Sequence, residues 1–264
     1  MQKPVRTYYE IATLTLLLLF SISTLSAQSK AGDFNHFHPR FEPFILPGGP
    51  EASAVQCVAQ DKLGFLWLAS KKGLYRFDGL QFIIYRHDPR DSTSIADDYV
   101  EWVMVDSKGI LWLGYWGAGV SAFNPITESC VHYHPEPGNP DALSDGSVAM
   151  IVEDRQGYIW VGTKEGLNRL DRKTGKFKRF FHDPNDPHSL SYNFVRSLYV
   201  DRSGTLWVGC GTLWDGNDLA GKRGGLNRFN PDGTFTRFLN DPEDPNSLGD
   251  NRVRAIFEDS RGNF

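Results

Sequence analysis

The sequence contains few cysteines, few methionines and no excess of positive charge. Its three cysteines, Cys57, Cys130 and Cys210, lie far apart and show no C-x-x-C spacing. This pattern predicts neither a zinc site nor a dense disulfide framework. One pair could join in an oxidising compartment, but buried thiols are the preferred interpretation. The net charge of −4, without a basic stripe, argues against nucleic-acid binding. We expect no nucleic-acid partner, no metal and no cofactor.

Long apolar runs are also scarce, and the clearest one lies at the N-terminus. Residues 11–25 are mostly apolar, follow Lys3 and Arg6, and precede the small residues at positions 26–27. This order predicts a secretory signal peptide over residues 1–27 and a periplasmic location for the mature chain. An uncleaved membrane anchor is the alternative, but the run is shorter than the ~20 residues that span a bilayer comfortably.

Turn-forming and aromatic residues are abundant instead, with 26 Gly, 15 Pro, 7 Trp and 18 Phe. This balance is typical of an all-β protein with short strands. The string Asp-x-x-Gly-x-x-Trp recurs about every 47 residues. A fifth copy opens at Asp259 and reaches Phe264. The four complete copies run from Asp61 to Trp67, Asp106 to Trp112, Asp154 to Trp160 and Asp201 to Trp207.

Each copy contains four strand-like segments separated by turns. In the third copy they cover 148–153, 158–162, 166–171 and 177–180. Four short alternating segments in each ~47-residue unit predict a β-propeller of four-stranded antiparallel blades. We expect the repeated Trp residues to pack between blades, and the repeated Asp residues to form turns. The predicted blades cover about 51–86, 99–134, 146–182 and 193–239, with a fifth starting near 251.

Polar connectors between the blades place His beside Asp, as in His182-Asp183-Pro184 and His87-Asp88-Pro89. A metal site is one interpretation of these pairs. However, Asn240 takes the place of His in another copy, which favours a loop residue that bonds its own backbone.

Residues 153–171, 73–79 and 189–191 resemble the two-component regulator propeller repeat, which forms the periplasmic sensor region of hybrid histidine kinases in Bacteroidetes-type bacteria. The resemblance covers residues 41–264. It implies a seven-bladed ring, followed by a stalk, a transmembrane helix anchoring the parent protein in the inner membrane, and a kinase. Such a ring needs roughly 330 residues.

We therefore expect an incomplete propeller, an N-terminal fragment whose partners are the missing C-terminal blades and signalling domains. Residues 28–50 form an expected N-terminal segment, in which 41–45 resembles the strand that closes such rings.

Departures from the repeat indicate where a ligand could bind. The loop between the second and third strands is short in the third copy but holds 15 residues between Gly209 and Gly225 in the fourth. Exposed aromatic rings beside polar groups suit a glycan fragment or another small extracellular ligand, and a nearby cation suits an acidic sugar. An insert that packs over the face, or that meets a partner in a homodimer, is the alternative. The candidate ligand contacts are Tyr115, Trp116, Lys164, Arg196, Trp214 and Asp215.

Catalytic motifs are missing from the sequence. It contains no G-x-S-x-G, H-E-x-x-H or phosphate-binding glycine loop. The predicted first strands are mainly apolar, with Glu101, Arg196 and Arg254 as polar exceptions. We expect a sensor module and no catalytic residues in this chain. A propeller lyase or glycoside hydrolase acting on polysaccharide is one alternative, and a scaffold without a small ligand is the other.

Overall fold

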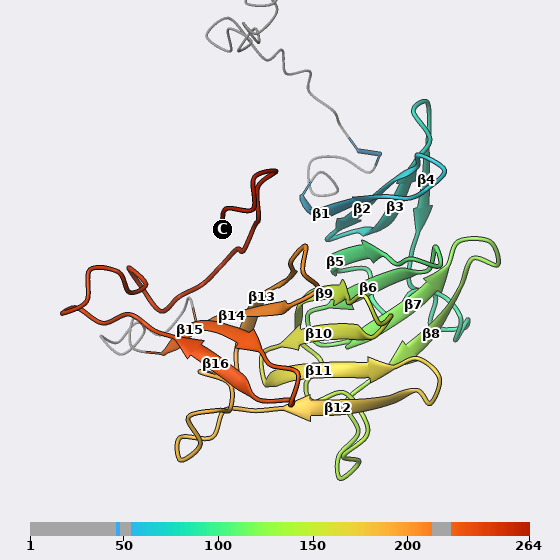
Figure 1. The fold of residues 1–264 in the computed structure, drawn as a ribbon. Coiled ribbons are helices and arrows are strands. Elements are labelled where there is room, and N and C mark those ends of the chain that lie inside the picture. Colours follow the sequence, from blue (N-terminus) through green and yellow to red (C-terminus); the bar gives the residue numbers. More distant parts are fainter. Residues whose placement is uncertain (1–45, 48–53, 213–222) are drawn as a thin grey trace, which may run out of the picture. The chain divides into compact units, whose positions relative to one another are not determined.

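The computed structural model describes residues 46–47, 54–212 and 223–264 (Figure 1). These residues form four four-stranded antiparallel sheets and contain no helix, so the predicted all-β, multi-bladed fold is confirmed. The predicted signal peptide and the predicted ring-closing strand at 41–45 lie outside the described residues. No helix long and apolar enough to cross a membrane occurs in the described ranges.

Each sheet is built from four strands that are consecutive in the sequence. The first contains β1 (Val55–Gln60), β2 (Leu66–Ser70), β3 (Gly73–Phe77) and β4 (Phe82–Tyr85). The second contains β5 (Val100–Val105), β6 (Leu111–Tyr115), β7 (Val120–Asn124) and β8 (Ser129–Tyr133). The third contains β9 (Val148–Glu153), β10 (Ile159–Thr163), β11 (Gly166–Asp171) and β12 (Lys176–Phe180). The fourth contains β13 (Val195–Val200), β14 (Leu206–Gly211), β15 (Gly224–Phe229) and β16 (Phe235–Phe238).

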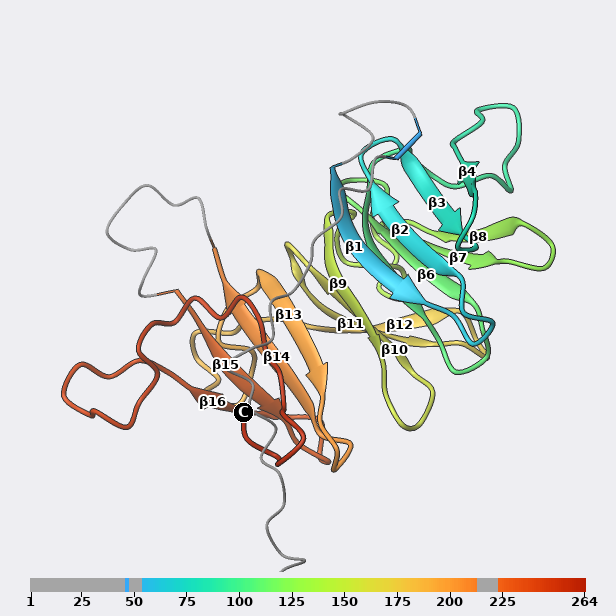
Figure 2. The same ribbon diagram turned by 90° about the horizontal axis from the view of Figure 1, so that it is seen from above.

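Neighbouring sheets meet through their first strands. Strand β1 contacts β5, β5 contacts β9, and β9 contacts β13. Figure 2 shows the four sheets following one another with these strands on the inner side. The first strand of each sheet is therefore called its inner strand, and the sheets are arranged as successive blades.

The repeated Asp does more than form a turn. In the third blade, Asp154 Oδ1 accepts hydrogen bonds from the backbone N–H groups of Gln156 and Tyr158 at 3.0 and 2.9 Å. Its other oxygen, Oδ2, accepts a hydrogen bond from Trp160 Nε1 at 2.6 Å. One carboxylate thus fixes both the hairpin turn and the orientation of the indole. The same indole–carboxylate bond joins Asp61 to Trp67, Asp106 to Trp112 and Asp201 to Trp207 at 2.8–2.9 Å.

The indole held in this way lies between neighbouring blades. Trp160 stacks on Phe180 of its own blade and meets Phe229 of the next blade edge-on, with ring centroids 4.9 Å apart. Trp67 meets Phe123 of the next blade in the same manner, at 5.8 Å. Trp112 instead lies beneath the Arg172 guanidinium of the third blade, 5.7 Å away. These contacts bury large aromatic areas at each blade junction, which is the main favourable contribution to packing.

Glycine, two residues after the Trp in the second, third and fourth blades, allows the next repeat to approach closely. A Cβ added to Gly162 would lie 2.6 Å from Val195 Cγ1 of the next blade, and one added to Gly114 would lie 2.7 Å from Val148 Cγ1. Neither glycine has a positive φ, so the requirement is space and not backbone conformation. Ala69 occupies this position in the first blade, where a methyl group is accommodated.

The connectors fix their own backbone. His87 Nδ1 lies 2.8 Å from the carbonyl oxygen of Ile95, and His182 Nδ1 lies 2.7 Å from that of Leu190. Asn240 Nδ2 donates to the Leu248 carbonyl in the same position. The expected loop-bonding role of the His and Asn residues is therefore observed directly.

The three cysteines are free thiols in the structure. Cys130 and Cys210 are buried, and burial raises the pKa of each thiol to about 12. This agrees with their interpretation as small buried side chains.

The indole–carboxylate bond predicts that Asp154→Asn destabilises the fold, because the substitution disrupts this bond. The amide oxygen can still accept from the turn, but its NH2 group then faces the indole N–H, so two donors oppose each other. We expect a loss of about 1–3 kcal/mol in the free energy of unfolding. Urea unfolding of the chain measures it. Asp232→Asn is the matched control, because Asp232 is exposed and accepts only from Thr234. Equal losses in both variants would contradict the role of the indole.

The close approach of the blades predicts that Gly162→Val is destabilising. The added side chain would overlap Val195, and overpacking of this kind costs about 1–3 kcal/mol. Gly249→Val is the control, because nothing lies within 4 Å of its added Cβ. Thermal unfolding should show a lower Tm for the first variant alone. A wild-type Tm for Gly162→Val would show that the blades tolerate a wider spacing.

The carboxylate of Asp201 makes stability depend on pH. Burial raises its pKa, but hydrogen bonds from Ser203, Trp207 and Thr205 outweigh this, so the pKa lies below its ordinary value. The stabilisation is therefore fully present above the unfolded pKa of ~3.9 and is lost as the pH falls through the lower folded pKa. The stability difference between wild type and Asp201→Asn should be constant above about pH 5 and shrink below it. A difference that grows on acidification would refute this assignment.

Candidate functional site

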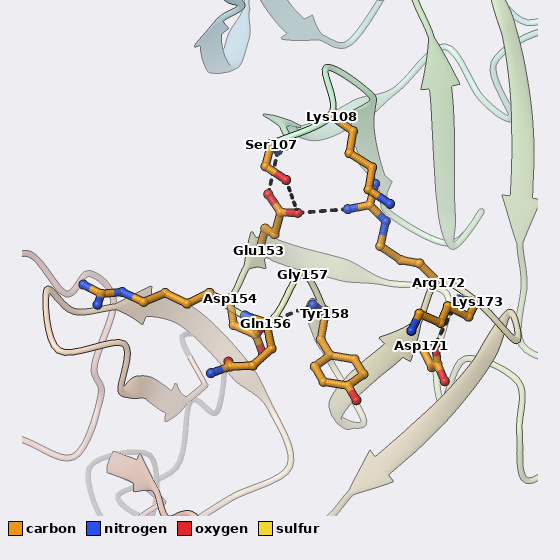
Figure 3. A pocket seen from close by; sticks show the side chains of 11 residues that line it. Ser107, Lys108, Glu153, Asp154, Gln156, Gly157, Tyr158, Asp171, Arg172 and Lys173 are labelled. Atoms are coloured by element: carbon orange, nitrogen blue, oxygen red, sulfur yellow. Dashed lines mark hydrogen bonds and ion pairs between the residues drawn. The ribbon is translucent and has the colours of Figure 1, made fainter.

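A hollow with a volume of about 550 Å³ lies at the turn end of the second and third blades (Figure 3). Two of its charged groups, Arg172 and Glu153, already pair with each other. Arg172 donates to Glu153 Oε1 at 2.9 Å and to the buried Asp106 at 2.6 Å. Glu153 also accepts from the backbone N–H and the hydroxyl of Ser107. These bonds join the two blades, so we interpret this hollow as a structural junction.

A second hollow, of about 320 Å³, lies at the opposite end of the strands. It is formed by the β6–β7 loop, the β10–β11 loop, the connector before β13 and the end of β14. We call it the rim pocket. Its lining residues are Trp116, Lys164, Glu165, Tyr192, Asn193, Phe194 and Thr212.

The aromatic residues of the rim pocket stand where the repeat has other residues. Trp116 occupies the loop position that is Lys71 in the first blade and Lys164 in the third. Tyr192 occupies a connector position that is Asp in the other copies. Those aspartates each accept a hydrogen bond from the backbone N–H two residues later, which Tyr192 cannot do. The equivalent residues are Asp97, Asp145 and Asp250.

The rim pocket presents an accessible ring beside charged groups. The Trp116 side chain is 47% exposed, and its ring centroid lies 6.5 Å from that of the buried Phe194. The backbone N–H of Lys164 donates to the Ser147 carbonyl at 3.0 Å, which fixes the loop and leaves the ammonium group in solvent. Lys164 and Glu165 form no ion pair within the part of the chain that the structure describes. A platform of this kind can stack on an apolar ligand face while the flanking charges meet its polar groups.

The structure brings Trp116, Lys164 and Arg196 to the same region. The Arg196 guanidinium lies 5.1 Å above the Phe194 ring, so Phe194 connects it with the rim pocket. Trp214 and Asp215 lie outside the described residues.

The expectation that Tyr115 contacts a ligand is corrected. Its side chain is fully buried, its hydroxyl accepts a hydrogen bond from the Ala96 backbone at 3.3 Å, and burial raises its pKa. Tyr115 ends β6, whereas Trp116 begins the loop. Tyr115 therefore belongs to the core.

Sequence reasoning missed Tyr192 and Phe194. The signal was present, because Tyr192 replaces an Asp that recurs in the connectors. Only the structure, however, shows that the connector lies against the β6–β7 and β10–β11 loops.

No three His, Cys, Asp or Glu side chains lie close enough to share a metal ion in residues 46–47, 54–212 and 223–264.

Comparison with known proteins gives one family match and one curated relative. A family described as SMP-30/Gluconolactonase/LRE-like region matches residues 63–257. A histidine kinase of Formosa agariphila is 39% identical over 80 residues, a stretch that makes up 30% of this chain and 6% of the kinase. The chain thus spans a small part of that relative's length. The resemblance to a histidine kinase, inferred from the sequence, is confirmed over this stretch.

Similar folds occur among solved structures. The extracellular domain of a protein described as a hybrid two-component system of B. thetaiotaomicron is 24% identical, with a TM-score of 0.47, over 79% of this chain and 38% of that one. Virginiamycin B lyase of Staphylococcus aureus is 15% identical, with a TM-score of 0.51, over 74% of this chain and 58% of that one. At this identity, the similarity to the lyase shows a shared fold alone.

Proposed function

We propose, from the premise that the chain belongs to the SMP-30/Gluconolactonase/LRE-like region family, that it is the ligand-sensing extracytoplasmic propeller module of a two-component signalling protein. The stretch that is 39% identical to a histidine kinase supports the signalling context. In this proposal the ligand is a glycan fragment, the location is the periplasm, and a membrane-anchored kinase in the parent protein receives the signal.

The rim pocket is the observation that carries the glycan proposal. Trp116 offers an exposed indole, and the half-buried Tyr192 and the buried Phe194 also line the pocket. The C–H face of a pyranose ring can stack on such a surface, while its hydroxyls bond to flanking polar groups. Lys164 and Glu165 supply one donor and one acceptor at the edge of this surface.

A catalytic propeller is the second candidate, because the family description includes a gluconolactonase. Glycoside hydrolysis commonly uses two carboxyl groups that flank the bond to be cleaved. The described lining of the rim pocket contains one carboxylate, Glu165, and no histidine. The arrangement therefore favours binding over acid–base catalysis. Release of new reducing ends or unsaturated products from polysaccharides would favour the enzyme.

The proposal predicts that Trp116 dominates glycan affinity. An oligosaccharide from a screened panel that raises the Tm of the wild-type chain should bind Trp116→Ala at least about tenfold more weakly, because the stacking surface is lost. Isothermal titration measures the affinity.

The control for this experiment is Phe238→Ala, which removes a partly exposed aromatic ring of β16 that does not line the rim pocket. It should retain wild-type affinity. Failure of the entire panel to bind, or equal affinity in Trp116→Ala and wild type, would contradict the proposed function.

A further inference from the structure

Every inner strand carries a β-bulge at the same point. In β13, Val195 pairs with Cys210 and Ser197 pairs with Gly209, which leaves Arg196 without a partner. In β5 the same shift leaves out Glu101. A bulge of this kind removes one residue from the ladder and redirects its side chain. The residues left out of the ladder in the other two inner strands are Gln56 and Ala149.

The backbone around the bulge is the same in every inner strand, but the residue at the bulge differs. The residue before it is Val in all four inner strands, and Val195 is held against Gly162 of the preceding blade. The bulged residue itself changes from blade to blade between neutral, acidic and basic. In the fifth copy, where residues 251–264 form no strand, Arg254 follows Val253 at the equivalent sequence position, and Val253 packs against Gly209. A fixed backbone that presents a different side chain in each blade is suited to ligand recognition and is not needed for packing.

Arg196 is the bulged residue beside the rim pocket. Its guanidinium lies 5.1 Å above the ring of Phe194, which lines that pocket. Among the described residues, the guanidinium forms no hydrogen bond and no ion pair, although it carries five N–H donors. Arg196 is half-buried, and a cation withdrawn from water without a hydrogen-bonded partner is unfavourable.

The charged groups around Arg196 leave an excess of positive charge. Its pKa is lowered by burial and by the positive charge of Arg254, and is raised by the carboxylate of Glu101. Glu101 is the one anion among these three groups. A second anion close to Arg196 would relieve the repulsion between the two guanidinium groups and satisfy their free donors.

We propose that Arg196 and Arg254 form an anion subsite at the inner edge of the rim pocket, which binds a carboxylate or sulfate group of the ligand whose ring stacks on Trp116. This inference rests on the proposed function for its biological meaning, and it specifies an acidic glycan fragment as the ligand class. Forked hydrogen bonds from guanidinium to a planar or tetrahedral oxyanion provide the selectivity.

Inorganic sulfate tests the subsite without knowledge of the glycan. The Tm of wild type and Arg196→Gln is measured in sodium sulfate and in sodium chloride at equal ionic strength. Sulfate stabilises most proteins in a nonspecific way, and this effect raises the Tm of both proteins equally. The difference between their Tm changes therefore measures specific binding of sulfate. We expect wild type to show the larger sulfate-specific rise, and sulfate affinity to fall at least about tenfold in the variant.

Two further variants make this result decisive. Arg254→Gln changes an exposed residue and should weaken sulfate binding without impairing folding. Arg90→Gln, which removes an exposed guanidinium paired with Asp88, should behave as wild type. Equal sulfate-specific rises in wild type, Arg196→Gln and Arg254→Gln would overturn the subsite.

Oligosaccharides separate this inference from the proposed function. Trigalacturonate, a 6-O-sulfated galactotriose and neutral galactotriose distinguish carboxylate, sulfate and neutral ligands. Binding of the acidic sugars that depends on both Trp116 and Arg196 supports both proposals. Binding of neutral sugar through Trp116, without sulfate discrimination by Arg196, retains the function and overturns the subsite. Arg196-dependent sulfate binding, without binding by any screened oligosaccharide, retains the subsite and contradicts the function.

Discussion

The hydrogen bond from each repeated indole to its turn carboxylate is the interaction on which the blade arrangement depends. The carboxylate has two oxygens, and the repeat uses them differently. In the third blade, Asp154 Oδ1 closes the β9–β10 turn while Oδ2 holds Trp160. The indole therefore has a fixed orientation when the next blade packs against it. A Phe at this position would fill similar space but would lack the directional bond, because only the indole carries an N–H donor.

This bond and the glycine behind it together set the spacing between blades. Trp160 defines the junction on one side of β10, and Gly162, two residues later on the same face of the strand, lets Val195 approach closely. The same Trp and the same close approach recur from blade to blade. A side chain that departs from the repeat therefore indicates a role other than packing. Tyr192 stands where the other connectors have a turn-forming Asp, and Arg196 stands at a bulge whose residue differs in every blade.

The sequence alone predicts the fold because every blade contains the same turns and the same alternation of apolar residues. It also predicts Trp116 and Lys164 as members of one rim, since both occupy loops between second and third strands. It fails at Tyr115, because one residue decides whether a side chain ends a strand inside the core or begins a loop in solvent. The contacts of Arg172 with Asp106 and Glu153 join residues of two blades, and no local pattern specifies them.

The two hollows differ in volume, but they differ more clearly in whether their charged side chains already have bonding partners. In the larger one, Arg172 already pairs with Glu153 and with Asp106, so a ligand that used Arg172 would have to break these contacts between blades. At the smaller one, Trp116 is exposed, and the guanidinium of Arg196, which lies over Phe194, forms no hydrogen bond and no ion pair within the described structure. We therefore favour the smaller hollow as the ligand site, and the positive charge of Arg196 and Arg254 is the reason that our proposal specifies an acidic ligand.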